Sequence, residues 1–182
     1  DLRGGLLFPA VQSYLDEIEK YLLEDLDLFK GQKTGEESQS EDFDPFLAYR
    51  VNLLVDNSDL QGAPVIMEIT PNYINLFGTI EYSYGRFGLG QTDFTKIKAG
   101  SFIKANGGYL VLNALDVLSE AGVWATLKRT LRYQTYEIQN PVSPFLISAR
   151  HLKPEPIKCD VKVIMIGDDY IYNLLYFLDD DF

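Results

Sequence analysis

Apolar residues near the N-terminus recur every three or four positions, which predicts an amphipathic α-helix over residues 9–30. Pro9 suits the first turn of such a helix, because the backbone N–H that proline lacks would have no partner there. The opposite face is acidic, so we expect a packed or coiled helix with one solvated face. A helix that docks on a partner protein is the alternative. The apolar positions are Val11, Leu15, Ile18, Leu22, Leu26 and Phe29, and the acidic ones are Asp16, Glu17, Glu19, Glu24, Asp25 and Asp27.

Residues 31–44, GQKTGEESQSEDFD, are nearly free of apolar side chains and rich in Gly, Ser and acids, as mobile linkers are. The chain therefore divides, in this prediction, into a helical segment (residues 1–30), a flexible acidic linker (31–44) and a folded core (45–182).

Beyond the linker, short apolar runs alternate with segments of helical periodicity. The runs YLVL and VKVIMI are almost wholly apolar or β-branched, as expected of strands buried on both faces. A helix is predicted to end at Gly107, which tolerates a left-handed conformation. This alternation predicts an α/β layered fold with a largely parallel sheet. The predicted strands are 49–55, 64–69, 109–112, 136–139, 144–148 and 161–166, and the predicted helices are 97–106, 123–133 and 168–178.

Composition narrows the classes of function. The 182 residues carry a formal net charge of −11, which argues against a nucleic-acid partner, since such surfaces depend on clustered positive charge. No apolar run approaches the roughly 18 residues of a membrane span, so we expect no membrane association. The single cysteine and single histidine provide neither an internal disulfide nor a Cys/His metal cluster. These counts favour a cytoplasmic protein.

Several catalytic motifs are absent from the sequence. It contains no G-x-x-x-x-G-K-[ST] phosphate loop and no G-x-S-x-G nucleophile elbow. His151 is interpreted as an exposed loop residue, and Cys159 as a buried small residue rather than a nucleophile. We therefore expect no catalytic residue and no metal centre in this chain. The remaining carboxylates considered as metal ligands are scattered, without the spacing of a calcium loop: Asp56, Asp59, Glu68, Glu81, Asp93 and Asp116.

Two stretches partly match sequence motifs of nucleotide-binding proteins. GRFGLG (85–90) lacks the glycine spacing of a dinucleotide-binding loop and predicts instead a mobile loop that presents Arg86 and Phe87. GGYLVLNALDVL (107–118) has the outline of the strand that carries the metal-binding acids of P-loop ATPases. Asn113 and Ala114, however, stand where Asp and Glu would be, so an ordinary buried strand is the alternative.

Five stretches taken together resemble the central region of Lon-like ATP-dependent proteases. The resemblance covers residues 44–182 and implies a partial P-loop AAA+ fold, and the N-terminal helix resembles the helical segment of these proteins. The stretches are PFLAYRVNLLVDNSDLQGAPVIME, PNYINLFGTIEY, TDFTKIKAGSFIKANGGYLVLNALDVL, WATLKRTLR and CDVKVIMIGDDYIYNLL.

The resemblance implies the AAA+ region of an ATP-dependent serine protease. Such proteins form hexameric rings that use ATP and Mg²⁺ to thread unfolded polypeptide towards a Ser–Lys protease domain. Neither that domain nor the Lys-containing phosphate loop of the family lies in these residues. The chain is therefore expected to be an incomplete AAA+ core, inactive alone, whose parent hydrolyses ATP and peptide bonds.

The resemblance also implies roles for individual residues. Asn113 and Ala114 take the places of the two acids at the Walker B strand, with Asp116 a turn further on as a substitute. Asp168 follows the strand that carries the residue sensing the γ-phosphate. The loop with Arg86 and Phe87 takes the place of the pore loop that grips substrate.

Two alternatives to an active ATPase stay open. An amide at residue 113 offers magnesium no negative oxygen, and Ala114 cannot polarise water, so a non-catalytic assembly or substrate-docking scaffold is the first. An unrelated acidic α/β protein-binding domain is the second.

Overall fold

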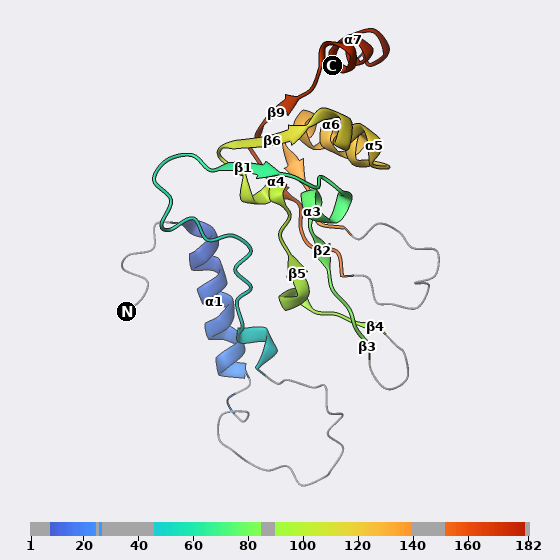
Figure 1. Cartoon of the computed structure of the whole chain (residues 1–182). Helices are drawn as coiled ribbons and strands as arrows, with labels where there is room; N and C mark the ends of the chain where they lie inside the picture. Colours follow the sequence, from blue (N-terminus) through green and yellow to red (C-terminus); the bar gives the residue numbers. More distant parts are fainter. Residues whose placement is uncertain (1–7, 25, 27–45, 85–89, 140–151, 181–182) are drawn as a thin grey trace. The chain divides into compact units, whose positions relative to one another are not determined.

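The computed structural model describes residues 8–24, 26, 46–84, 90–139 and 152–180, and the chain forms two compact units, Asp1–Val51 and Asn52–Phe182 (Figure 1). The predicted linker lies outside the described residues, so the predicted segmentation stays a prediction.

The first unit contains helix α1 (Pro9–Glu24) and the short 3-10 helix η2 (Leu47–Tyr49). The expected amphipathic character of α1 is present, since Val11, Leu15, Ile18 and Leu22 are half-buried while the acids on the other face are exposed. The helix is thus confirmed over the described residues.

A parallel sheet of three strands, in the order β1–β6–β9, forms the frame of the second unit. Its strands are three of those predicted from apolar runs, which confirms the α/β fold. The central strand β6 pairs with both neighbours, so that Leu110 faces Ile66 on one side and Val163 on the other. The bounds are Val65–Glu68 for β1, Tyr109–Asn113 for β6 and Lys162–Ile166 for β9.

Short helices fill the connections between these strands. Helix α6 has the bounds that its periodicity predicts, and α7 begins one residue after the predicted start. The connection from β1 to β6 holds α3 (Tyr73–Phe77) and α4 (Ser101–Lys104); that from β6 to β9 holds α5 (Ala114–Ser119) and α6 (Val123–Tyr133); and α7 (Asp169–Leu178) follows β9.

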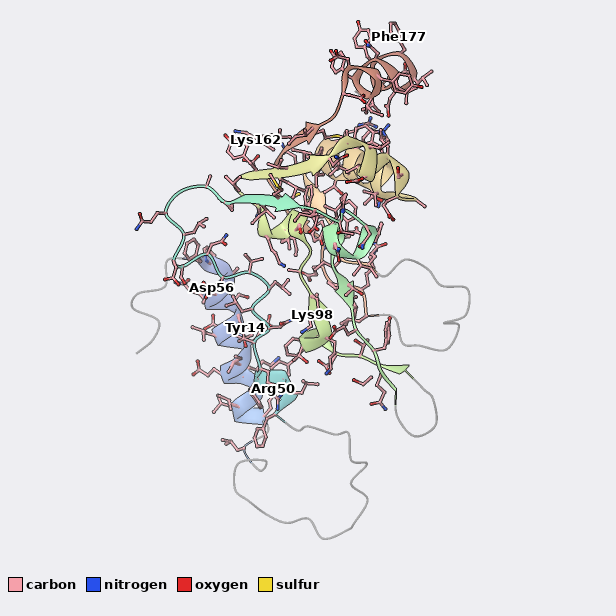
Figure 2. The ribbon with its side chains drawn as sticks, in the orientation of Figure 1. Tyr14, Arg50, Asp56, Lys98, Lys162 and Phe177 are labelled. Carbon is pink, nitrogen blue, oxygen red and sulfur yellow. The ribbon has the colours of Figure 1, made fainter. Side chains whose placement is uncertain are left out.

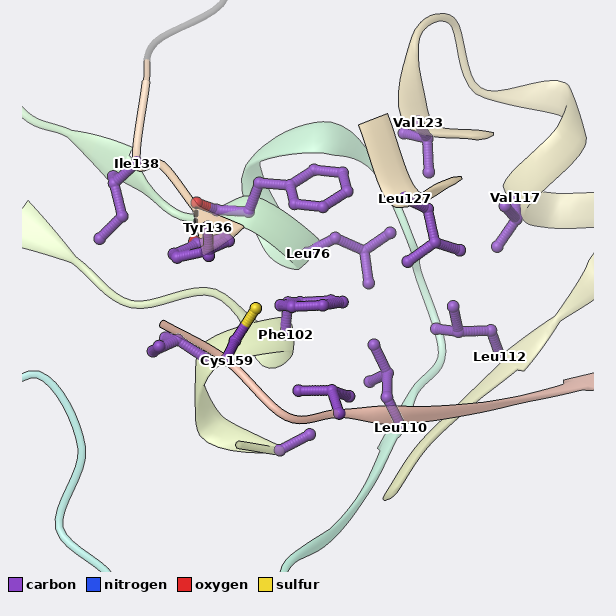
Figure 3. Close-up of a cluster of buried hydrophobic side chains, with 14 of the residues drawn as sticks. Leu76, Phe102, Leu110, Leu112, Val117, Val123, Leu127, Tyr136, Ile138 and Cys159 are labelled. Atoms are coloured by element: carbon purple, nitrogen blue, oxygen red, sulfur yellow. Dashed lines mark hydrogen bonds between the residues drawn. The ribbon is translucent and has the colours of Figure 1, made fainter. Parts of the chain in front are cut away.

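The core lies against one face of the sheet. Leu110 and Leu112 of β6 are fully buried there, among side chains from the connecting helices (Figure 3). A stack of three aromatic rings extends this core, and the Tyr136 hydroxyl in it donates a hydrogen bond to the Phe77 carbonyl oxygen. Burial raises the pKa of the Tyr136 phenol well above its ordinary value. The core includes Leu76, Phe77, Phe102, Val117, Val123, Leu127 and Tyr136.

The other face of the sheet is bare over the described residues. Alternate side chains of the same strands point to it, as the two-residue period of a strand requires. Its large apolar members are exposed: Val65 by 66%, Met67 by 67%, Tyr109 by 37%, Ile164 by 47% and Ile166 by 55%.

Between α3 and α4 the chain leaves the core as an antiparallel arm. Strands β2 (Thr79–Ile80) and β5 (Ile97–Lys98) pair at its base, and β3 (Ser83–Tyr84) and β4 (Gly90–Gln91) pair further out. The 3-10 helix η3 (Phe94–Lys96) lies on the returning side. Residues 85–89, which contain the predicted pore loop, thus connect two paired strands.

Three predicted elements are wrong or shortened. Residues 49–55 form no strand, because the Asn52 amide donates to the Phe94 and Ile97 carbonyl oxygens at 2.8 and 3.0 Å in place of a ladder. The predicted helix 97–106 begins as β5 and is helical only over α4. Of the predicted strand 136–139, only Tyr136 pairs, in the ladder of β7 (Thr135–Tyr136) with β8 (Ile157–Lys158). The predicted strand 144–148 lies outside the described residues.

The base of the arm is closed by two glycines whose backbones touch. A Cβ atom on Gly78 would lie 2.2 Å from the Lys98 carbonyl oxygen, and one on Gly100 would lie 2.2 Å from the Leu76 carbonyl oxygen. Real Cβ atoms do not approach backbone this closely, so only glycine fits at either position. These are the glycines of NLFG and IKAG, which explains why those stretches carry glycine.

We predict that Gly78→Ala lowers the free energy of unfolding by more than about 4 kcal/mol, because the new methyl group must displace backbone. Gly107→Ala is the control for the positive φ: φ is +79° at Gly107 and +75° at Gly78, yet a Cβ on Gly107 meets nothing within 4 Å. The control should cost only the left-handed strain of about 1–2 kcal/mol. Equal losses of unfolding free energy in the two variants, measured by chemical denaturation, would contradict the close contact of the Gly78 backbone with its neighbours.

Candidate functional site

Polar side chains gather where the three parallel strands end. Glu68 is the last residue of β1, Asn113 is the last of β6, and Asp168 follows β9 by two residues. A cavity of about 260 Å³ opens at this edge and brings together Glu68, Asn113 and Asp116. Its other lining residues are Met67, Ile69, Val111, Leu112 and Ile166. Of the residues named from the sequence, the structure thus places Asn113, Asp116 and one of the scattered carboxylates, Glu68, along one cavity.

Asn113 is the N-cap of helix α5. Its side-chain oxygen accepts a hydrogen bond from the backbone N–H of Asp116 at 3.2 Å, which satisfies one of the unpaired donors at the start of the helix. The Asp116 carboxylate lies in the first turn, where the helix dipole favours negative charge. The residue at the predicted Walker B position therefore has a local structural role of its own.

Ala114 begins α5 but does not line the cavity. Its side chain is buried, with 3% exposure, and packs beside Gly167, where an added Cβ would lie 3.1 Å from the Ala114 Cβ. A longer side chain at residue 114 would enter this tight contact between α5 and the turn that follows β9.

Asp168 is the N-cap of helix α7, and its carboxylate accepts a hydrogen bond from the Ile171 backbone N–H at 2.8 Å. It is exposed and is not among the residues lining the cavity. Gly167 joins it to β9 and brings the first turn of α7 against α5. Asp168 thus borders the edge without entering the cavity.

Ser101, the first residue of α4, is a member of the site that sequence reasoning missed. Its buried hydroxyl donates to the Glu68 carboxylate, which also accepts from the Thr70 backbone N–H at 3.0 Å. These bonds fix the Glu68 carboxylate at the end of β1. The available signal was a serine placed directly after the close-packed Gly100, at a helix start.

The oxygen atoms at this edge meet some of the requirements for binding a hard cation. Glu68, Asn113 and Asp116 offer oxygen ligands, which Mg²⁺ prefers, and the cavity has room for a hydrated ion. Within the described ranges, however, no three His, Cys, Asp or Glu side chains come together as a metal site. Direct coordination by this chain alone is therefore limited to few ligands, and the remainder would be water and phosphate.

Cys159, which was also named from the sequence, belongs to the core cluster and not to this edge. Arg86 and Phe87 are outside the described residues, as is His151. Cys159 is 7% exposed, and burial, followed by the neighbouring Asp160, raises the pKa of its thiol. A raised pKa removes the thiolate that a nucleophile needs, so the expectation of a buried structural cysteine is confirmed. Among the described helices, none has the length and apolar character to cross a membrane.

We predict that the cap residues at this edge contribute to stability independently of any ligand. Asn113→Ala should lower the free energy of unfolding by about 1 kcal/mol, whereas Asn113→Asp should keep it within about 0.5 kcal/mol, because a carboxylate caps as well as an amide. Asp168→Ala should cost a similar amount at α7. Thermal or chemical denaturation without nucleotide measures both, and an unchanged Asn113→Ala variant would contradict the role of the cap.

Comparison with known proteins shows which family the chain belongs to. No curated protein matches the chain. Among solved structures, the crystal structure of NtrX from Brucella abortus matches with 19% identity and a TM-score of 0.41, over 65% of this chain and 24% of that one. The sequence pattern of the family described as "LonB-like, AAA domain" matches residues 61–182, which is more than half of the chain and includes the whole sheet. The chain therefore belongs to the LonB-like AAA domain family.

Proposed function

We propose that this chain is the AAA+ region of an ATP-dependent Lon-like serine protease, which passes unfolded polypeptide to a separate protease domain. The observation that carries the proposal is the match to the LonB-like AAA family across the sheet and its carboxyl edge. In open α/β sheets, ligands bind outside the carboxyl ends of the strands, where Glu68, Asn113 and Asp116 meet.

In this proposal the parent assembles as a hexameric ring and binds Mg²⁺ and ATP. Asp116 and Glu68 are the carboxylates of this chain that would face a hydrated magnesium ion. Ser101 and the Thr70 backbone N–H hold the Glu68 carboxylate in place. Magnesium would neutralise the charge of the phosphates when bound. The lysine loop that holds the phosphates in the family is not in these residues.

The arm supports the assignment of a substrate-handling loop. Residues 85–89 connect the paired strands β3 and β4, and Asn52 and the Gly78–Gly100 contact secure the base of the arm. The pairing of β3 with β4 holds the two ends of this segment side by side. An aromatic ring between glycines provides apolar contact area there without demanding one peptide sequence.

A second candidate function is a non-catalytic scaffold that docks substrate or organises assembly. It is favoured by the edge itself, because the Asn113 oxygen is engaged in capping α5 and Ala114 is buried without a carboxylate. In this reading, the fold of the family is kept and hydrolysis of ATP is lost.

Nucleotide titration of the full-length protein separates the two functions. The ATPase proposal predicts saturable binding of Mg²⁺–ATP and turnover, both lost when the lysine of an upstream phosphate loop is replaced by Ala. Removal of Mg²⁺ with EDTA should abolish turnover. Absence of both binding and turnover in the unmodified full-length protein would favour the scaffold.

For the arm, we predict that Phe87→Ala in the full-length protein slows degradation of an unfolded protein by about ten-fold, because the loop loses its apolar contact area. Phe87→Tyr, which keeps the ring, should retain most of the rate. Cleavage of a short peptide that needs no threading should be unchanged in both variants. Equal degradation by Phe87→Ala and the unmodified protein would remove the pore-loop assignment.

A further inference from the structure

Two side chains of α6 converge on Asp179, the residue that follows the end of α7. The Asp179 carboxylate accepts a hydrogen bond from Trp124 Nε1 at 2.6 Å, and Lys128 Nζ lies 2.8 and 2.7 Å from its two oxygens. Lys128 Nζ also lies 5.4 Å from the centroid of the Trp124 ring. We call these three residues the Asp179 clamp.

The clamp has better geometry than three other ion pairs between described residues. The Lys128 and Asp179 side chains are 23% and 14% exposed, whereas Lys20–Glu24, Lys98–Glu81 and Lys153–Glu137 are all longer and more exposed. Charge-assisted bonds that are partly shielded from water are stronger than exposed ones. Trp124 and Lys128 stand one helical turn apart on α6, so a single helix face presents both donors to the carboxylate.

Apolar packing fixes α7 only weakly over the described residues. Leu175, with 6% exposure, is the one buried side chain of α7 and Ile171 is half-buried, whereas Tyr170 and Leu178 are 72% and 77% exposed. Phe177, labelled on α7 in Figure 2, is 77% exposed. The ring contacts of Tyr176 with Tyr172 and Phe177 lie within the helix itself and do not attach it to the core. The orientation of α7 on α6 therefore depends strongly on the clamp.

The other end of the same helix borders the carboxyl edge of the sheet. Asp168 caps α7 there, and Gly167 packs against Ala114 at the start of α5. A helix of ten residues is about 15 Å long and behaves as a rigid rod on this scale. If α7 tilts about Gly167, Asp168 stays near the pivot, but its carboxylate is bonded to the Ile171 N–H in the first turn of α7 and therefore turns with the helix.

We propose that Asp179 is a positioning residue: held by Trp124 and Lys128, it orients α7 and thereby sets the direction of the Asp168 carboxylate at the carboxyl edge of the sheet. The positioning of α7 follows from contacts within this chain, and its consequence for nucleotide chemistry rests on the proposed function. The two parts are tested separately.

The first test is hydrogen exchange of this chain without nucleotide. Asp179→Asn keeps the shape of the side chain but removes the charge that Lys128 contacts. The amides of Ile171 and the rest of α7 should exchange at least ten-fold faster, while those of β6 stay unchanged. Because Trp124 is the single tryptophan of the chain, its fluorescence emission should also shift on this substitution.

Asp180→Asn is the matched control, since it removes the same charge from the adjacent, exposed residue. It should leave the exchange of α7 as it is. Lys128→Met should reproduce the effect of Asp179→Asn, and Lys128→Arg should restore the protection of α7. If the amide exchange rates of α7 are unchanged in Asp179→Asn, the clamp does not hold α7. A uniform rise of the exchange rates across α7 and β6 would equally overturn this role of the clamp.

The second test uses ATP turnover by the full-length protein. Asp179→Asn should lower kcat by about five-fold or more with KM for ATP little changed, because the Asp168 carboxylate is reoriented while the phosphate-binding groups are untouched. Faster exchange of α7 combined with an unchanged kcat would overturn the positioning role. A parent that neither binds nor hydrolyses ATP would contradict the proposed function, and hydrogen exchange alone then decides whether Asp179 positions α7.

Discussion

The contact between the backbones of Gly78 and Gly100 is the constraint on which the rest of the second unit depends. Gly78 ends α3 and Gly100 precedes α4, so the contact fixes the two short helices of this connection against each other. On one side, Phe77 and Phe102 enter the core directly from these helices and join the aromatic stack. On the other side, β2 and β5 leave as a pair and form the arm. Core packing and arm placement therefore share one origin, and a side chain at either glycine would disturb both.

The carboxyl edge of the sheet illustrates how one polar residue can meet two demands. Each of β6 and β9 is followed by a helix, and each helix needs an acceptor for its unpaired N–H groups. Asn113 and Asp168 supply that acceptor. The same two positions border the region where ligands bind in folds of this class. A polar residue there is consequently no proof of catalysis, and its chemistry has to be judged from what its oxygen atoms already bind.

Sequence patterns predicted those parts of the fold whose signals are local and strong. The apolar runs of β6 and β9 and the periodicity of α6 predicted these elements almost residue for residue. Residues 49–55 carry an equally apolar pattern, but a tertiary bond from the Asn52 side chain replaces strand pairing there. The predicted helix 97–106 failed because Ile97 and Lys98 pair with β2, a long-range contact that periodicity does not encode. At the candidate site, the resemblance to the Lon-like family singled out Asn113 and Asp116, and both line the same cavity. Ser101 acts through Glu68, 33 positions away in the chain, and no spacing rule connects them.

The bare face of the sheet has a consequence for the behaviour of this chain in solution. Three strands of about five residues span roughly 240 Å² on one face, at about 4.8 Å between strands and 3.3 Å per residue. A stable, specific dimer buries about 800 Å² on each partner, so this face is too small to define one. It is nevertheless apolar enough, through Val65, Met67 and Ile166, to make molecules adhere weakly as their concentration rises. If the isolated chain self-associates in solution, we therefore attribute it to weak, non-specific apolar contacts of this surface. Such association is a different property from assembly into an ordered ring.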